Sequence, residues 1–127
     1  MSDQHDPKWH WEQGNRYAVE AIKTLLLLNG GAALALLAYG GNKVKVDKIA
    51  TEVARLVGNS IASFGFGALC AAVCFILAYL TQLQYGNNKW RPATIIHFST
   101  YGALMLCMLG FLVGLYFARQ AVLLQLS

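Results

Sequence analysis

The chain has 127 residues, of which 57% are hydrophobic and 13% are charged, and its mean hydropathy is +0.45. Soluble domains carry about 25% charged residues, so this composition excludes a soluble enzyme. Three segments, 24–42, 56–88 and 92–118, contain no Asp, Glu, Lys or Arg. Each is long enough for a helix to cross a hydrocarbon layer of about 30 Å. The sequence therefore predicts an all-α integral membrane protein, one domain over residues 1–127, with three transmembrane helices.

The basic residues are too dispersed for a nucleic-acid interface. The formal net charge is +4 and the pI is about 9.1, but the ten Lys and Arg residues are spread over short polar segments. Nucleic-acid binding requires a dense basic face, whereas dispersed basic residues beside membrane spans contact lipid headgroups. We therefore expect the lipid bilayer, and no nucleic acid, to be a partner of this chain.

The first transmembrane helix is predicted over about 18–39. Gly14 and Asn15 interrupt a short N-terminal segment, and a helical pattern of apolar residues follows from Arg16. The two glycines and the asparagine at 40–42 favour the left-handed conformation that ends helices.

Residues 43–58 form the longest polar connector. Their apolar side chains recur at helical spacing and their charged side chains fall on another face, which predicts a short amphipathic helix. Such a helix lies on the bilayer or packs against its own bundle, and the alternative is that it docks a partner protein. Asn59 and Ser60 are the predicted cap of a second transmembrane helix over about 61–85.

A turn at 86–88 separates the second span from a third, predicted over about 93–118. Three crossings place the N-terminus and this turn on one side of the membrane, and the polar connector and the C-terminus on the other. Equal numbers of basic residues fall on the two sides, so the positive-inside rule does not orient the chain. Tryptophan and arginine beside spans are typical anchors at the membrane–water interface. The candidate anchors are Trp9, Trp11, Trp90 and Arg91.

Each predicted span carries small residues at helix-face spacing. Lipid provides no hydrophobic driving force between helices, so close backbone contact at small residues supplies much of the attraction. These faces either pack the three helices of one chain together or mediate association between chains, and the sequence leaves both interpretations open. The candidate packing residues are Gly31, Ala35, Ser63, Gly67, Ala71, Ala103, Gly110 and Gly114.

Two polar side chains within the spans are candidate functional residues, because polar groups in hydrocarbon are costly. Asn29 lies in the middle of the first apolar run, where its amide either bonds across a helix contact or lines a wet lumen. His97 lies near the start of the third span. A hydrogen-bonded interface histidine is the favoured interpretation, because no partner histidine is recognisable. Ligation of haem is the alternative.

The chain shows no catalytic pattern: no nucleophile with a base, no glycine-rich phosphate loop and no carboxylate pair within a span. Its three cysteines all lie inside predicted spans, where cysteine and methionine are ordinary apolar fillers, and their odd number implies no disulfide framework. We therefore expect no enzymatic activity, no bound metal and no cofactor.

The run AIKTLLLLNGGAA at 21–33, with FGAL at 66–69 and AYLTQ at 78–82, resembles a group of small uncharacterised bacterial membrane proteins. The resemblance covers roughly the first two spans and implies a multi-pass protein of the bacterial inner, cytoplasmic membrane. It implies no site residues, because that group has no assigned activity. Three spans in a chain of this length are also similar in layout to phage holins and to small membrane effectors of antiphage systems.

The small-residue faces, the mid-span Asn29 and the lack of catalytic residues favour a homo-oligomeric membrane protein that forms a pore or perturbs the bilayer. Three helices cannot enclose a polar pathway alone, so conduction would require several copies. The alternative is a membrane anchor or accessory subunit. It would recruit a partner protein or redox complex through the N-terminal segment or the 43–58 helix.

Overall fold

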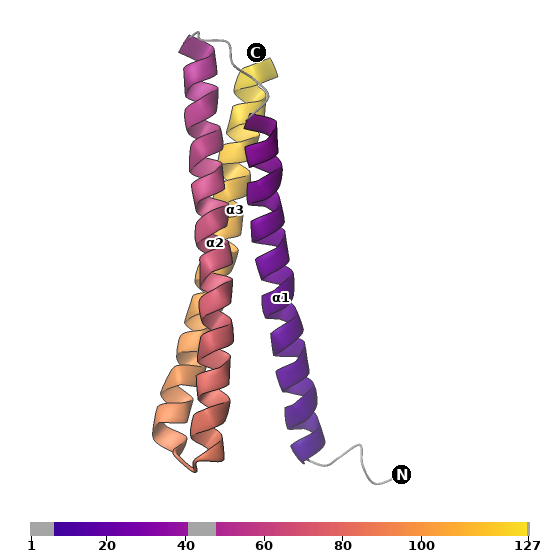
Figure 1. The fold of residues 1–127 in the computed structure, drawn as a ribbon, viewed down its shortest axis with the longest axis vertical. Helices are drawn as coiled ribbons and strands as arrows, with labels where there is room; N and C mark the ends of the chain where they lie inside the picture. Colours follow the sequence, from indigo (N-terminus) through magenta and orange to yellow (C-terminus); the bar gives the residue numbers. More distant parts are fainter. Residues whose placement is uncertain (1–6, 41–47, 127) are drawn as a thin grey trace.

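The computed structural model describes residues 7–40 and 48–126, which form three long α-helices and no strand. The helices are α1 (Pro7–Gly40), α2 (Lys48–Gly86) and α3 (Trp90–Leu126) (Figure 1). All three are long and apolar enough to cross a membrane. The predicted all-α fold with three transmembrane helices is therefore confirmed.

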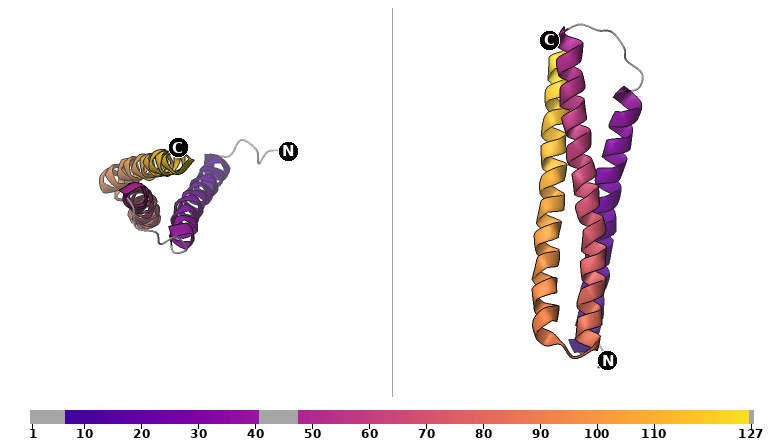
Figure 2. Two further views of the ribbon diagram at one scale, coloured as in Figure 1. Left: turned by 90° about the horizontal axis from the view of Figure 1, so that it is seen from above. Right: turned by 60° about the vertical axis from the view of Figure 1, so that its left-hand side comes forward.

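Helices α2 and α3 form an antiparallel hairpin, and α1 packs beside it. Contacts between α2 and α3 are the most extensive, α1 packs mainly on α2, and α1 touches α3 little (Figure 2). The start of α1 and the α2–α3 turn lie at one end of the bundle, and the ends of α1 and α3 lie at the other (Figure 1). We call these the turn end and the C-terminal end.

The predicted separate amphipathic helix over 43–58 is wrong for the part that the structure describes. Residues 48–58 are the first turns of α2, which continues without a break into the second span, while 41–47 lie outside the described residues. Continuing the helix keeps every backbone hydrogen bond internal, which matters most at a membrane boundary. Gly58 and Asn59 are therefore accommodated within the helix, and Ser60 is not an N-cap.

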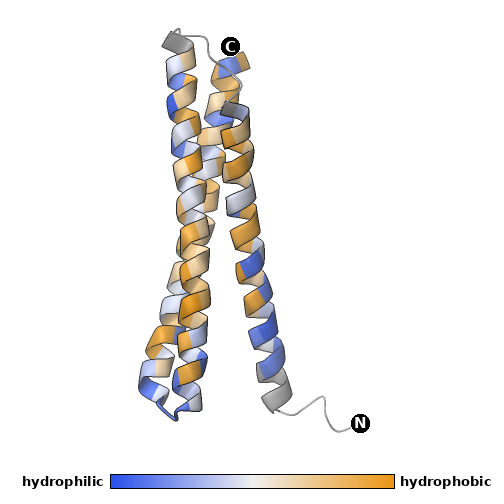
Figure 3. Cartoon of the chain, viewed as in Figure 1, coloured by the Kyte–Doolittle hydropathy of each residue, from blue (hydrophilic) through white to orange (hydrophobic). Residues whose placement is uncertain are grey.

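The predicted interruption at Gly14 and Asn15 is also wrong. Helix α1 runs through both residues without a break. A single glycine costs a helix only about 1 kcal/mol relative to alanine, which the long apolar segment that follows outweighs. The polar N-terminal part of α1 is thus a continuous extension of the first span, and it forms the hydrophilic section of that helix (Figure 3).

The turn between α2 and α3 follows from its asparagines. Asn88 has a φ of 57°, in the left-handed region that asparagine tolerates better than most residues. The backbone N–H of Asn87 donates to the carbonyl of Leu83 at 3.1 Å, and that of Lys89 donates to Gln84 at 2.9 Å. The predicted turn is therefore present, and it caps the last carbonyls of α2.

The buried core is narrow and consists mostly of small side chains. Its centre contains Ile22 from α1, Cys70, Ala71 and Cys74 from α2, and Cys107 from α3. Large apolar side chains instead point outward, including Leu27, which is 74% exposed, and Phe98, which is 67% exposed. An apolar exterior around a core of small residues is the arrangement expected for helices surrounded by lipid.

Candidate functional site

The backbones of α2 and α3 meet where two glycines face each other near the middle of the hairpin. A Cβ on Gly110 would lie 3.0 Å from the carbonyl oxygen of Ser63 and 3.1 Å from the Cα of Gly67. No side chain separates the two helices here, so the helix axes can approach closely. The small residues at these positions therefore serve contact within the chain.

One helical turn further along α3, Gly114 provides space for an aromatic ring. A Cβ on Gly114 would lie 2.7 Å from the ring of Phe64, which is only 1% exposed. This ring also packs at a tilt of 53° against Phe111, with centroids 5.6 Å apart. The hydroxyl of Ser60 donates a 2.6 Å hydrogen bond to the carbonyl oxygen of Gly114. This buried bond satisfies a polar side chain that would otherwise lie unpaired in an apolar environment.

Asn29 is fully buried where all three helices meet. Its Nδ2 donates to the carbonyl of Leu25 at 2.9 Å and to Sγ of Cys107 at 3.5 Å. Its Oδ1 has no hydrogen-bond partner among the described residues and lies 2.1 Å from where a Cβ on Gly67 would be. Because a Cβ lies about 1.5 Å from its Cα, this oxygen is within about 3.6 Å of the Gly67 Cα, as in a Cα–H···O contact. The side chain of Asn29 on α1 thus occupies the space that a side chain at Gly67 on α2 would take. Asn29 does not line a lumen within the chain.

The remaining predicted packing residues of the hairpin lie near this contact. Ala71 is fully buried, Ser63 is half-buried and bonds the Asn59 carbonyl at 2.8 Å, and Ala103 packs against the core. All of them face other helices of the same chain.

Helix α1 differs, because its predicted small residues face outward. Gly31 and Ala35 are exposed, and nothing lies within 4 Å of the position that a Cβ on Gly31 would take. Gly31 is two and a half helical turns from the buried Ile22, so the two residues point in opposite directions. Ala38 lies on the same exposed face. We call this surface, formed by Gly31, Ala35 and Ala38, the free face of α1.

The free face continues into a polar section toward the turn end. Glu20 and Thr24 are exposed and precede Gly31 by 11 and 7 residues, which places them on the same side of α1. Lys23 donates to Glu20 at 2.8 Å, and both side chains are more than half exposed. The pairing reduces the net charge that α1 presents near the membrane boundary, and Lys23 can extend its ammonium group toward water.

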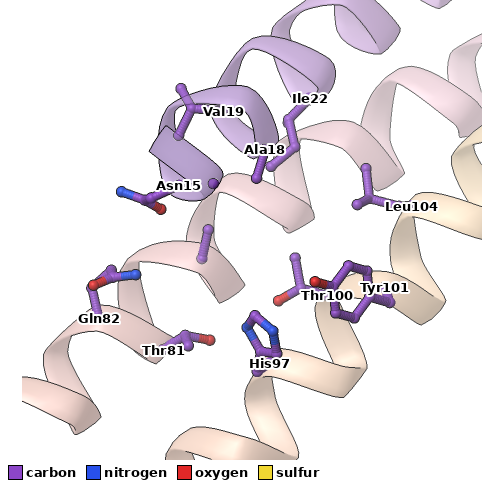
Figure 4. A pocket seen from close by; sticks show the side chains of 12 residues that line it. Asn15, Ala18, Val19, Ile22, Thr81, Gln82, His97, Thr100, Tyr101 and Leu104 are labelled. Atoms are coloured by element: carbon purple, nitrogen blue, oxygen red, sulfur yellow. The ribbon is translucent and has the colours of Figure 1, made fainter. Parts of the chain in front are cut away.

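A cavity of about 250 Å³ opens between the three helices near the turn end (Figure 4). His97 and Tyr101 of α3 lie on one side of it, where their rings form a T-shaped contact with centroids 5.0 Å apart. The amides of Asn15 and Gln82 lie at the opposite rim. The other lining residues are Gly14, Ala18, Val19, Ile22, Ala78, Thr81, Thr100 and Leu104.

Sequence reasoning singled out His97 but missed the residues that the fold brings to it. Asn15 and Gln82 lie far apart along the chain, and only the packing of α1 on α2 places both at one rim. Polar residues near the ends of predicted spans were the available signal, although the same pattern is common in residues that simply reach the interface.

The interface anchors fall at the turn end where the structure describes them. Trp90 and Arg91 are exposed at the start of α3, and the Trp90 ring forms an edge contact with Tyr85 at 5.3 Å. Trp9 and Trp11 belong to the first turns of α1, at the same end, and their side chains lie outside the described part.

The described part of the chain contains no cluster of metal ligands. No group of three or more His, Cys, Asp or Glu side chains there could hold a metal ion. The three cysteines are free thiols buried in the bundle.

The fold and its surface define the chain as a multi-pass integral membrane protein with three helical spans. No protein-family model, curated protein or solved structure that we compared with the chain matches it.

Proposed function

We propose that the chain is a homo-oligomeric membrane protein whose assembly forms a pore or perturbs the bilayer. The similarity of its layout to holins and to small antiphage effectors gives this proposal its biological type, and the resemblance of its first two spans suggests the bacterial inner membrane. The activity belongs to the assembly and requires no enzymatic chemistry.

A single protomer is too tightly closed to conduct ions through its centre. Ala71, Cys74 and Cys107 are fully buried where the helices meet, and Asn29 fills the remaining space above Gly67. Any aqueous path must therefore form between copies of the chain, or between a cluster of copies and lipid.

The free face of α1 is the observation that supports association most directly. Glycine and alanine in the middle of a span pack poorly against lipid and expose the helix backbone, whereas they allow a second helix to approach closely. On α2 and α3 the corresponding small residues are already used within the chain. Gly31, Ala35 and Ala38 have no such use in the described structure, and α1 contacts the rest of the bundle on one side only.

The polar section of the same helix supports a wet assembly. Glu20 and Thr24 continue the free face toward the turn end, and Lys23 pairs with Glu20. Copies that meet along α1 would therefore bring ion pairs and hydroxyls together near the membrane boundary. Charged side chains within spans commonly face a water-filled space, because contact with lipid is costly. A cluster built on α1 would provide such a space.

Replacing Gly31 by leucine tests the proposal without disturbing the protomer. Gly65 on α2 is the matched control, because it is also exposed with nothing within 4 Å, and each glycine lies two residues from the Asn29–Gly67 contact. The purified full chain is sized in detergent and reconstituted in liposomes for ion-flux measurements. We expect the wild type and Gly65→Leu to be oligomeric and to conduct, and Gly31→Leu to lose both properties.

Three outcomes contradict the proposal. A monomeric wild-type particle removes the basis for a pore, as does an oligomeric preparation without ion flux. Equal behaviour of Gly31→Leu and Gly65→Leu would show that association does not use the free face of α1.

The second candidate function is a membrane anchor or accessory subunit, and helix length favours it. Helix α2 has 39 residues and is about 58 Å long, whereas a bilayer with its headgroups is about 40–45 Å thick. The first turns of α2, with their exposed Glu52–Arg55 ion pair, therefore extend toward water and offer a polar helical surface to a partner. Recovery of a stoichiometric partner from native membranes would support this function, and recovery of the chain alone would contradict it.

A further inference from the structure

We propose that the cavity near the turn end binds the uncharged head group of a lipid-soluble amphiphile that accepts hydrogen bonds at two opposite ends. A para-quinone on an alkyl or prenyl tail has this chemistry. The proposal is independent of the pore, because it concerns the space between the helices of one protomer.

The cavity contains polar groups with unused hydrogen-bonding capacity on both sides. The hydroxyls of Thr81 and Thr100 are occupied, since they donate to carbonyls of their own helices at 2.8 and 3.0 Å. Three other lining side chains make no side-chain hydrogen bond among the described residues: His97, Tyr101 and Gln82. Because lipid offers the exposed parts of these side chains no hydrogen-bond partner, unused donors beside the cavity favour a ligand with acceptor oxygens.

The positions of these groups favour a flat head group that spans the cavity. His97 and Tyr101 approach from α3, whereas the amides of Asn15 and Gln82 lie at the opposite rim (Figure 4). Ile22 and Leu104 also line the cavity and give it apolar walls. Donors on two sides of a cavity that also has apolar walls match a ring that carries carbonyls at its opposite ends.

Charge excludes the most abundant competing head groups. Among the described side chains, no Asp, Glu, Lys or Arg lines the cavity. A phosphate there would have no lysine or arginine partner among the described side chains, which is unfavourable in a partly apolar space. The volume of about 250 Å³ is also small compared with typical sites for drug-sized ligands of about 300–1,000 Å³, so it fits a single ring.

The location explains why the ligand would be an amphiphile. The cavity lies toward the turn end, because its lining residues His97 and Tyr101 come within about three helical turns of Trp90, where α3 begins, and Asn15 belongs to the polar section of α1. Helices α1 and α3 touch little, so an apolar tail can leave the cavity between them and enter lipid. Polar head and apolar tail would then both lie in the environments they prefer.

The test uses the full chain in nanodiscs with a decyl-substituted benzoquinone at increasing mole fraction in the lipid. The readout is the thermal unfolding midpoint, which rises with a ligand that binds the folded state. We expect a saturable rise for the wild type. Loss of one hydrogen bond in Tyr101→Phe or Gln82→Leu should weaken apparent binding about threefold to tenfold.

Tyr116→Phe is the matched control, because Tyr116 and Tyr101 are similarly exposed on α3, at 56% and 53%, and only Tyr101 lines the cavity. This control should bind like the wild type. Ala18→Leu fills the cavity and should abolish the rise, and the two milder variants keep the test valid if this one fails to fold.

Four results overturn the proposal. The first is the lack of a saturable rise in the wild type. The second is an equal rise with decylbenzene, which has no carbonyl oxygens. The third is competition by an anionic phospholipid at equal mole fraction, which would identify a phosphate headgroup site. The fourth is equal binding by Tyr101→Phe, Gln82→Leu and the control.

Discussion

Replacing Gly67 by alanine should loosen α1 from the α2–α3 hairpin, because Asn29 occupies the space of the missing side chain. The added Cβ would lie 2.1 Å from Oδ1 and 2.6 Å from Cγ of Asn29, well below the 3.0 Å that real Cβ contacts respect. Asn29 is fully buried and bonded to Leu25 and Cys107, so it cannot swing into open space. Overpacking of this kind costs about 1–3 kcal/mol.

A double-mutant cycle isolates this contact. Asn29→Ala alone should cost about 0.6–2 kcal/mol, because it removes the bond to Cys107 on α3 and the contact with Gly67 on α2. In the double variant the new methyl group occupies vacated space, so the two changes should couple favourably by about 1–3 kcal/mol. The measurement is reversible unfolding of the purified chain in mixed detergent micelles, followed by helical circular dichroism and by accessibility of the buried cysteines.

Gly65→Ala is the control for the change in helix propensity, since nothing lies within 4 Å of its added Cβ. It should be neutral or slightly stabilising. If Gly67→Ala is as stable as Gly65→Ala, or if the coupling with Asn29→Ala is below about 0.5 kcal/mol, then α1 does not pack on α2 through this contact.

Three further predictions follow from the same packing. Ser60→Ala removes the 2.6 Å bond to Gly114 and should destabilise the hairpin by about 0.6–1.7 kcal/mol in the same unfolding measurement, and an unchanged midpoint would contradict the assigned bond. The three native cysteines are between 0% and 9% exposed, so a maleimide should label them slowly in the folded chain and fast in denaturing detergent. Fast labelling of both states would contradict this burial. In sealed vesicles a membrane-impermeant thiol reagent should label Asn88→Cys and Gln125→Cys from opposite sides of the membrane, because the α2–α3 turn and the end of α3 lie at opposite ends of the bundle. Labelling of both variants from the same side would contradict three crossings.

The sequence alone determined the number and the type of the elements. In hydrocarbon every backbone N–H and C=O must bond internally, so a long segment without charges has few alternatives to a helix. The segments 24–42, 56–88 and 92–118 therefore indicated three helices and their antiparallel order before any contact was known. The turn was similarly predictable, because the asparagines at 87 and 88 tolerate a backbone that ends one helix and starts the next.

Helix boundaries were less predictable, and the errors have one cause. Gly14 with Asn15, and Gly58 with Asn59, resemble interruptions by the rules for soluble helices. Both pairs lie inside continuous helices, because a break beside the membrane would expose backbone groups that the continuous helix satisfies. The prediction therefore wrongly assigned residues 48–58 to a separate helix and not to the second span.

Only the tertiary structure decided which small residues face their own chain. Periodicity identified the faces that carry Gly67, Gly110 and Gly31, but it contains no information about which helix each face meets. In a soluble protein the polar side of a helix indicates which side faces water. In a membrane both the lipid and the neighbouring helices are apolar, so hydropathy does not indicate which side of a helix faces lipid. The packing of α1 on α2 assigns Gly67 to Asn29 and leaves Gly31 exposed, and it brings Asn15, Gln82 and His97 to one cavity from three helices.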